Sequence, residues 1–88
     1  MIIKKRAVAG SLQSNDCLVE IAPLDHLDIE LLSPLKDRFG EQMLEAAKAV
    51  LTEQQITTGR VRITDKGALD CTIRARVKTA VLRAAQGE

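Results

Sequence analysis

The residues best suited to chemistry gather in one short polar stretch, residues 10–17, with the sequence Gly-Ser-Leu-Gln-Ser-Asn-Asp-Cys. Serine, asparagine and aspartate favour turns because their short side chains hydrogen-bond to nearby backbone groups. The stretch is therefore predicted to be a turn between two strands, with Ser14 exposed at its tip. An exposed serine can be chemically idle, act as a nucleophile or serve as a point of covalent attachment. The turn alone leaves these three possibilities open.

A serine nucleophile needs a base within hydrogen-bond reach, and the chain contains one histidine, His26. His26 lies in a predicted turn one strand further along, which puts it at the opposite end of the expected sheet from Ser14. We interpret His26 as a solvated loop residue and assign no catalytic residue. No glycine-rich phosphate-binding fingerprint is present either, so a stand-alone enzyme is not expected.

The two cysteines, Cys17 and Cys71, lie far apart in the sequence. With a single histidine they do not supply the ligands or the spacing of a metal motif, so no metal site is predicted. Free cysteines are commonly buried, and both are expected to be reduced and partly buried. Whether the two thiols approach each other stays open.

The composition describes an ordinary soluble chain, expected to form one domain over residues 1–88. The net charge is +1, which produces no strong field to attract nucleic acid or an anionic membrane. Phe39 is the only aromatic residue, whereas proteins that bind single-stranded nucleic acid usually stack bases on several. The first residues do not resemble a signal peptide and no apolar run approaches a membrane span, so a cytoplasmic location is expected.

Hydrophobic periodicity predicts an α+β domain with the element order β-β-β-α-β-α. Strands are expected over residues 5–13, 17–22, 27–31 and 60–64, and helices from 34 to about 52 and from 68 to 85. Ser33 is expected to cap the first helix, with Pro34 at its first position. Apolar stripes are expected on the two helices: Leu35, Phe39, Met43, Ala46, Ala47 and Val50 on the first, and Leu69, Ile73, Val77, Ala80, Val81 and Ala84 on the second. An antiparallel sheet of about four strands with both helices packed on one face would bury both stripes.

The second helix also carries four basic residues, Arg74, Arg76, Lys78 and Arg83. They could form a solvated face, or bind nucleic acid, a phosphorylated ligand or an acidic partner. Their helical spacing divides them between two sides, which suits a phosphate or protein contact better than a single DNA groove.

Several of these segments resemble the acyl carrier protein of citrate lyase, its gamma subunit. The similar segments are residues 7–16, 22–25, 38–40, 65–71 (Asp-Lys-Gly-Ala-Leu-Asp-Cys), 74–76 and 82–85. Each is short, but together they cover nearly the whole chain in the same order and at the same spacing. Ordinary acyl carrier proteins are acidic helical bundles with an Asp-Ser-Leu signature, and their fold is not expected for this chain.

The resemblance implies a carrier that performs no bond chemistry itself. Members bear phosphoribosyl-dephospho-coenzyme A, joined by a phosphodiester to the serine that matches Ser14, and the thiol of this group carries an acetyl or citryl thioester. The implied partners are an enzyme that loads the group, an alpha subunit (the acyl transferase) that exchanges acetyl for citryl, and a beta subunit (the citryl lyase) that releases oxaloacetate. Together they cleave citrate to acetate and oxaloacetate, and the carrier only positions the thioester.

Two positions depart from the family pattern: Gln13 replaces the expected Glu, and Ser11 stands where Thr is common. Neither change removes the attachment hydroxyl, although the loss of a carboxylate beside Ser14 could alter recognition by the loading enzyme. We hypothesise that Lys66, Arg74 or Arg76 contacts the phosphates of the prosthetic group or docks a partner subunit.

Two alternatives remain from the sequence. One is the carrier subunit of malonate decarboxylase, which uses the same prosthetic group. The other is an RNA- or protein-binding α+β module in which Ser14 is idle, although the lack of aromatic residues disfavours RNA.

Overall fold

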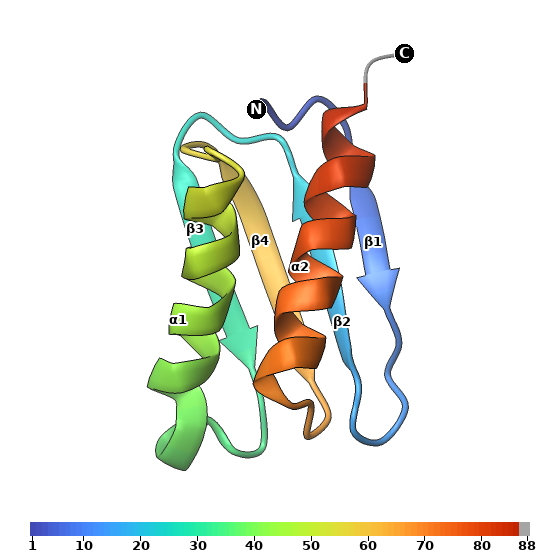
Figure 1. Ribbon diagram of the computed structural model, residues 1–88, viewed down its shortest axis with the longest axis vertical. Helices are drawn as coiled ribbons and strands as arrows, with labels where there is room; N and C mark the ends of the chain where they lie inside the picture. The colour runs from blue at the N-terminus through green and yellow to red at the C-terminus, as the bar shows by residue number, and fades with distance from the viewer. Residues whose placement is uncertain (87–88) are drawn as a thin grey trace.

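A four-stranded sheet with two helices on one of its faces forms the protein (Figure 1). The computed structural model describes residues 1–86. The elements, in chain order, are β1 (Ala7–Gly10), β2 (Cys17–Ala22), β3 (Leu27–Leu32), α1 (Lys36–Glu53), β4 (Gly59–Asp65) and α2 (Asp70–Ala85). The predicted α+β class, the order of elements and the placement of both helices on one face are confirmed.

The sheet is mixed, with strand order β1-β2-β4-β3. β2 pairs antiparallel with β1 and with β4, but β3 and β4 are parallel. The expectation of a purely antiparallel sheet is therefore wrong for this one pair. Because α1 carries the chain back along the sheet, β4 begins at the same end as β3 and runs in the same direction (Figure 1).

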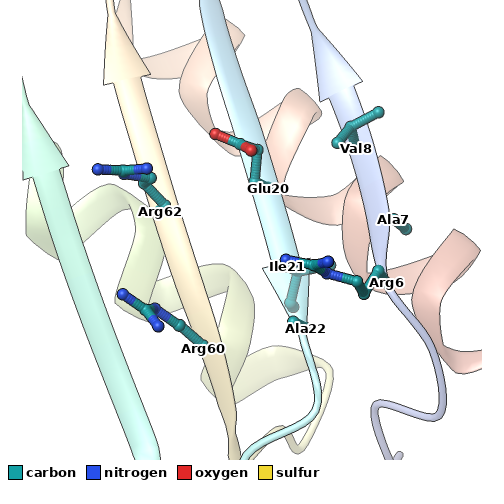
Figure 2. A pocket seen from close by; sticks show the side chains of 8 residues that line it. All are labelled: Arg6, Ala7, Val8, Glu20, Ile21, Ala22, Arg60 and Arg62. Atoms are coloured by element: carbon teal, nitrogen blue, oxygen red, sulfur yellow. The ribbon is translucent and has the colours of Figure 1, made fainter.

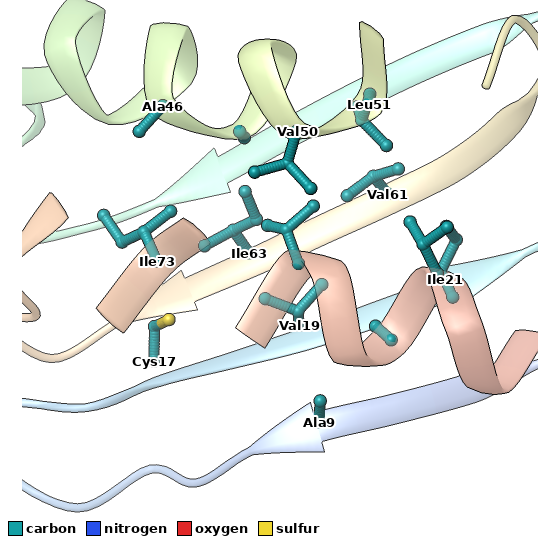
Figure 3. Packing of buried hydrophobic residues seen from close by; sticks show 14 of the residues in the cluster. Ala9, Cys17, Val19, Ile21, Ala46, Val50, Leu51, Val61, Ile63 and Ile73 are labelled. Carbon is teal, nitrogen blue, oxygen red and sulfur yellow. The ribbon is translucent and has the colours of Figure 1, made fainter. Parts of the chain in front are cut away.

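The core lies between the sheet and the helices (Figure 3). Alternate residues of β2 and β4 point into it, as the period-two pattern predicts, while Arg60 and Arg62 point to the uncovered face (Figure 2). The buried hydrophobic residues of the two central strands and α2 are Cys17, Val19, Ile21, Val61, Ile63, Ile73, Val77, Ala80, Val81 and Ala84. Four of the ten helical core residues are alanine (Ala46, Ala47, Ala80 and Ala84), and such short side chains let the helices lie close to the sheet and to each other.

The ends of the helices differ from the predicted ends. α1 begins at Lys36, so Pro34 lies in the preceding turn, and Ser33 does not cap the helix. The Ser33 hydroxyl instead accepts a hydrogen bond from the backbone N–H of Leu35 at 3.0 Å. The first turn of α1 extends past the end of β3, so the sheet no longer covers it there (Figure 1).

Three members of the predicted apolar stripes, at the starts of the two helices, are exposed. Leu35, Phe39 and Leu69 are 37%, 41% and 70% exposed, and they lie together where α1 begins and α2 is about to begin. The other predicted stripe members are buried or nearly so.

The two cysteines differ in environment. Cys17 is completely buried at the start of β2, whereas Cys71 is exposed in the first turn of α2. Both thiols are free, as expected. The expectation of partial burial is wrong for each, since Cys17 is fully buried and Cys71 is exposed. Across residues 1–86, no helix has the length and apolar character needed to cross a bilayer.

Candidate functional site: the Ser14 turn

Ser14 lies in the turn between β1 and β2, at the end of the sheet where α2 begins (Figure 1). Its side chain is exposed, as are those of Gln13 and Asn15. The hydrogen bonds that organise the turn use the side chains of Ser11 and Asp16 and the backbone, and the Ser14 hydroxyl takes part in none of them. The hydroxyl is therefore free to react.

The start of the turn depends on Gly10. Its φ of +94° lies in the region that side-chain-bearing residues rarely adopt. A Cβ atom there would lie 1.9 Å from the carbonyl oxygen of Cys17, which accepts a hydrogen bond from the N–H of Ser11 at 3.2 Å. Glycine is required at this point because β1 and β2 approach each other closely just before the turn.

The far side of the turn is held by the loop between β4 and α2. Asn15 N–H donates to the carbonyl of Lys66 at 2.8 Å, and Lys66 N–H donates to the carbonyl of Asp16 at 2.9 Å. Asn15 adopts φ of +68°, which asparagine tolerates better than most residues. These two bonds continue the β2–β4 pairing by one step and attach the turn to the loop.

Asp16 connects the turn to α2. Arg76 donates from Nε to Oδ1 at 3.0 Å and from Nη2 to Oδ2 at 3.1 Å, which is the bidentate geometry of a strong charge-assisted pair. Ser11 Oγ donates to Oδ2 and the N–H of Cys17 donates to Oδ1, both at 2.7 Å. The hydrogen bond from Arg76, followed by those from Ser11 and Cys17, lowers the pKa of Asp16 to about 2.

The three predicted cationic residues all belong to this end or to the helix that starts there. Lys66 is exposed and its backbone is bonded to the two residues that follow Ser14. Arg74 is exposed on α2, whereas the guanidinium of Arg76 is engaged with Asp16. On the same helix, Arg83 donates to a backbone carbonyl of β1 at 2.8 Å and Lys78 is exposed. The two predicted sides of the basic helix thus differ: one bonds within the protein and the other faces solvent.

His26 lies at the opposite end of the sheet from Ser14, as predicted (Figure 1). Its Nδ1 is 2.7 Å from Oδ1 of Asp25, and the side chains of both residues are largely exposed. The hydrogen bond with His26 lowers the pKa of Asp25. His26 therefore has no route to the Ser14 hydroxyl. Within the described part of the chain, no cluster of three or more His, Cys, Asp or Glu side chains is arranged to hold a metal ion.

The uncovered face of the sheet carries a shallow, largely charged hollow of about 450 Å³ (Figure 2). Arg6, Arg60 and Arg62 surround Glu20 there, and Arg62 also pairs with Glu30 at 3.0 Å. The hollow involves the beginning of β1 and of β4, away from the Ser14 turn. Three arginines outnumber Glu20 in its lining, so the hollow is net positive, but its distance from the Ser14 turn means that it does not extend that site.

Comparison with known proteins decides the family. Residues 4–84 match the family described as malonate decarboxylase delta subunit (MdcD), an acyl carrier protein family. The chain is 50% identical over 84 residues to the citrate lyase acyl carrier protein of Treponema denticola, covering 96% of this chain and 97% of that one. The chain belongs to the citrate lyase acyl carrier protein family.

Other members of the family are similar over comparable lengths. The citrate lyase acyl carrier protein of Haemophilus influenzae (strain PittEE) is 50% identical, with 96% of this chain and 88% of that one covered. The one from Cronobacter sakazakii is 45% identical, with 100% and 92% covered. The resemblance first drawn from short segments is confirmed over nearly the full length.

A crystal structure of a Thermus thermophilus protein has a similar fold, with a TM-score of 0.69 over 94% of this chain. The identity is 12%, and this chain spans only 16% of that one, so the likeness concerns the fold alone.

Sequence reasoning singled out Ser14 but missed the residues that hold its turn. Asp16 and Arg76 are 60 positions apart, and no local pattern connects them. One signal was available: Arg76 falls on the side of α2 away from Arg74, where a long side chain can reach a neighbouring element.

Proposed function

We propose that this chain is the acyl carrier subunit of citrate lyase and that Ser14 is the attachment point for phosphoribosyl-dephospho-coenzyme A. The observation that carries the proposal is the Ser14 hydroxyl, exposed and unbonded on a turn that is itself held on both sides. Membership of the family supports it, since the resemblance of residues 7–16 to the family motif implies that Ser14 is the attachment serine.

The loading step is a phosphoryl-type transfer onto Ser14. The Ser14 oxygen forms a new O–P bond to an activated phosphate ester of the prosthetic group, and the P–O bond to the phosphate leaving group breaks. The proton of the hydroxyl leaves to a base of the loading enzyme, because His26 lies in the β2–β3 loop at the far end of the sheet. Once attached, the group supplies a thiol that carries the acyl chain as a thioester.

The residues around the turn fit a phosphate-bearing group. Lys66 lies across the turn from Ser14 with an exposed side chain, and Arg74 is exposed on the helix that begins at the same end. We assign Lys66 to the phosphates and Arg74 to the phosphates or to a partner subunit. Asp16 is the acidic group of the turn, and its charge is offset by Arg76.

In this role the chain is non-catalytic and works in a cytoplasmic hetero-oligomer with the alpha and beta subunits. Tethering the thioester to a small carrier makes each encounter with an active site intramolecular, at effective concentrations on the order of millimolar. The overall reaction it serves converts citrate to acetate and oxaloacetate.

A second candidate is the carrier subunit of malonate decarboxylase, favoured by the description of the matching family. It would use Ser14 and the same prosthetic group. Adding citrate or malonate to complexes reconstituted with the partner subunits of each enzyme separates the two, since only the correct set turns over its substrate.

The decisive experiment is the intact mass of the chain purified from a host that makes the loading enzymes. We expect the added mass of the prosthetic group on the parent chain, mapped to Ser14 by fragmentation, and its absence from Ser14→Ala. Thr57→Ala is the control and should be loaded like the parent, because Thr57 is an exposed hydroxyl residue in the loop between α1 and β4, at the other end of the sheet. An unmodified parent chain in cells with active loading enzymes would exclude the carrier function and favour a binding module with an idle serine.

A further inference from the structure

We infer that Arg76 is a positioning residue that presents Ser14 for loading: it acts through Asp16 to hold the turn and does not contact the phosphates itself. The inference rests on the proposed attachment at Ser14 and identifies which residues of the chain make that attachment efficient.

The carboxylate of Asp16 is fully used within the protein. Oδ1 accepts from the N–H of Cys17 and from Nε of Arg76, and Oδ2 accepts from Oγ of Ser11 and from Nη2 of Arg76. A carboxylate has about four such acceptor positions, and all are occupied here. The Asp16 side chain is only 16% exposed, so it is a structural centre of the turn and not a ligand-binding group.

Arg76 is held by the same pair, and its side chain is 42% exposed. Its side chain passes over Gly10, where an added Cβ atom would lie 3.2 Å from Cδ of Arg76, and reaches Asp16 with two of its nitrogen atoms. The bidentate geometry fixes both the distance and the angle between α2 and the turn, which a lysine at this position could not do. This is the only side-chain bond between α2 and the Ser14 turn among the described residues.

The turn is thus held from two sides, and neither side uses Ser14. Arg76 holds Asp16 from α2, and the backbone of Lys66 holds Asn15 and Asp16 from the β4–α2 loop. Without the Arg76–Asp16 pair, the residues between Gly10 and Asn15 would sample more conformations, and only a fraction would fit the loading enzyme. When the competent fraction falls, the apparent affinity falls by the same factor.

This role predicts a particular kinetic signature. Arg76→Met should raise the KM of the loading enzyme for the carrier about tenfold and leave kcat within about twofold, since the competent conformer, once bound, reacts normally. Asp16→Asn should have the same effect. The double variant should be no worse than either single variant, because both remove the same pair.

The measurement is the rate at which the added mass appears on the carrier, at several carrier concentrations. The reaction contains the purified loading enzyme and the activated form of phosphoribosyl-dephospho-coenzyme A. Lys78→Met is the matched control: Lys78 is an exposed cation on the same helix with no assigned contact, so this variant should leave the KM unchanged. Amide hydrogen exchange of the apo chains is the second readout: residues 11–16 should exchange faster in Arg76→Met and Asp16→Asn, but not in Lys78→Met. Arg76→Lys tests the geometry of the pair. It keeps the positive charge but cannot form the bidentate bond, so it should still show most of the rise in KM seen in Arg76→Met.

The outcomes separate the possibilities. A fall in kcat in Arg76→Met with an unaffected Asp16→Asn would show that Arg76 contacts the donor directly, which overturns the inference. Parental loading kinetics in both variants would overturn it as well. If the parent chain and Lys78→Met are not loaded at all, the proposed attachment fails and the positioning role fails with it. Loading of the parent with an unchanged KM in Arg76→Met and Asp16→Asn rejects the positioning role alone.

Discussion

Gly10 shows at the scale of one residue how closely the Ser14 turn is built. A methyl group at this position would lie 1.9 Å from a backbone carbonyl, and the φ of +94° disfavours any side chain. We expect Gly10→Ala to lower the free energy of unfolding by at least about 2 kcal/mol, as strained positive-φ substitutions with a backbone clash do. Urea denaturation of the apo chain measures it.

Gly40 is the matched control for this substitution. It lies within α1, where an added Cβ would meet the flexible Lys36 side chain at 3.1 Å. Because alanine is favoured over glycine in a helix by about 1 kcal/mol, Gly40→Ala should be neutral or stabilising. Equal losses in the two variants would contradict the special role of Gly10.

The pairing of Asp16 makes the stability of the chain depend on pH. The pKa of Asp16 falls from 3.8 to about 2 on folding, so between these values the folded state binds fewer protons than the unfolded state. The Asp16 contribution is therefore fully present above about pH 4 and is lost as the pH falls toward 2. Urea midpoints measured from about pH 6 down to about pH 2.5 should decline more steeply for the parent than for Asp16→Asn, and parallel curves would exclude this linkage.

The two thiols should differ strongly in reactivity. Burial, helped by the nearby Asp16 and Asp65, raises the pKa of Cys17 to about 11, whereas Cys71 is exposed. Since the thiolate is the reactive form, iodoacetamide at about pH 8 should modify only Cys71 in the folded apo chain and both cysteines in denaturant. Mass spectrometry counts the modifications, and Cys71→Ser should stay unmodified until it unfolds. Rapid labelling of Cys17 in the folded chain would mean that the core opens there.

At the scale of elements, Asp65 joins three segments at the Ser14 end. It is 1% exposed, and its carboxylate accepts from the N–H of Ala68 and from Oγ of Ser33, both at 2.8 Å. It thus links the end of β4, the loop before α2 and the turn before α1.

Removing Asp65 should loosen all three segments. We expect Asp65→Ala to cost about 2–3 kcal/mol of unfolding free energy, since hydrogen bonds to a charged group are strong and their buried donors would lose their partner. Ser33→Ala removes only one of the two bonds and should cost about 1 kcal/mol. Thermal and urea unfolding of both variants measure the two losses of unfolding free energy. A larger loss in Ser33→Ala than in Asp65→Ala would contradict the central position of Asp65.

Periodicity predicted which elements form and which faces are buried, but not how the strands pair. A two-residue repeat in β3 and β4 indicates that one face of each strand is covered. The repeat is identical in parallel and antiparallel strands, so it does not predict their relative direction. The direction was set by α1, whose length returns the chain to the starting end of the sheet. The helical repeat likewise placed Phe39 and Leu69 on apolar faces, but it could not show that these faces continue beyond the sheet.

The same limit applies to the site. Local composition singled out Ser14 and its turn, because turn formation depends on neighbouring residues. The contacts that hold the turn, from Arg76 and from the backbone of Lys66, arise from segments far along the chain, and only the assembled fold brings them together.

At the scale of the whole molecule, the fold separates its two ends. The Ser14 turn, the β4–α2 loop and the beginnings of both helices lie at one end of a body 36 Å long (Figure 1). Near the other end, the backbone N–H of Lys4 donates to the carbonyl of Ala84 at 2.9 Å, so the first residues and the last turn of α2 lie side by side.

The contact between the first residues of the chain and the last turn of α2 has a practical consequence. A fluorescent protein, biotin tag or bead linker added before Met1 would be attached at the end of the molecule away from the Ser14 turn (Figure 1). Chains immobilised in this way would all point their Ser14 turn outward, in an array suited to single-molecule measurement of loading. The same adjacency would let a short linker join the two termini and allow new ends to be opened in the exposed loop around His26.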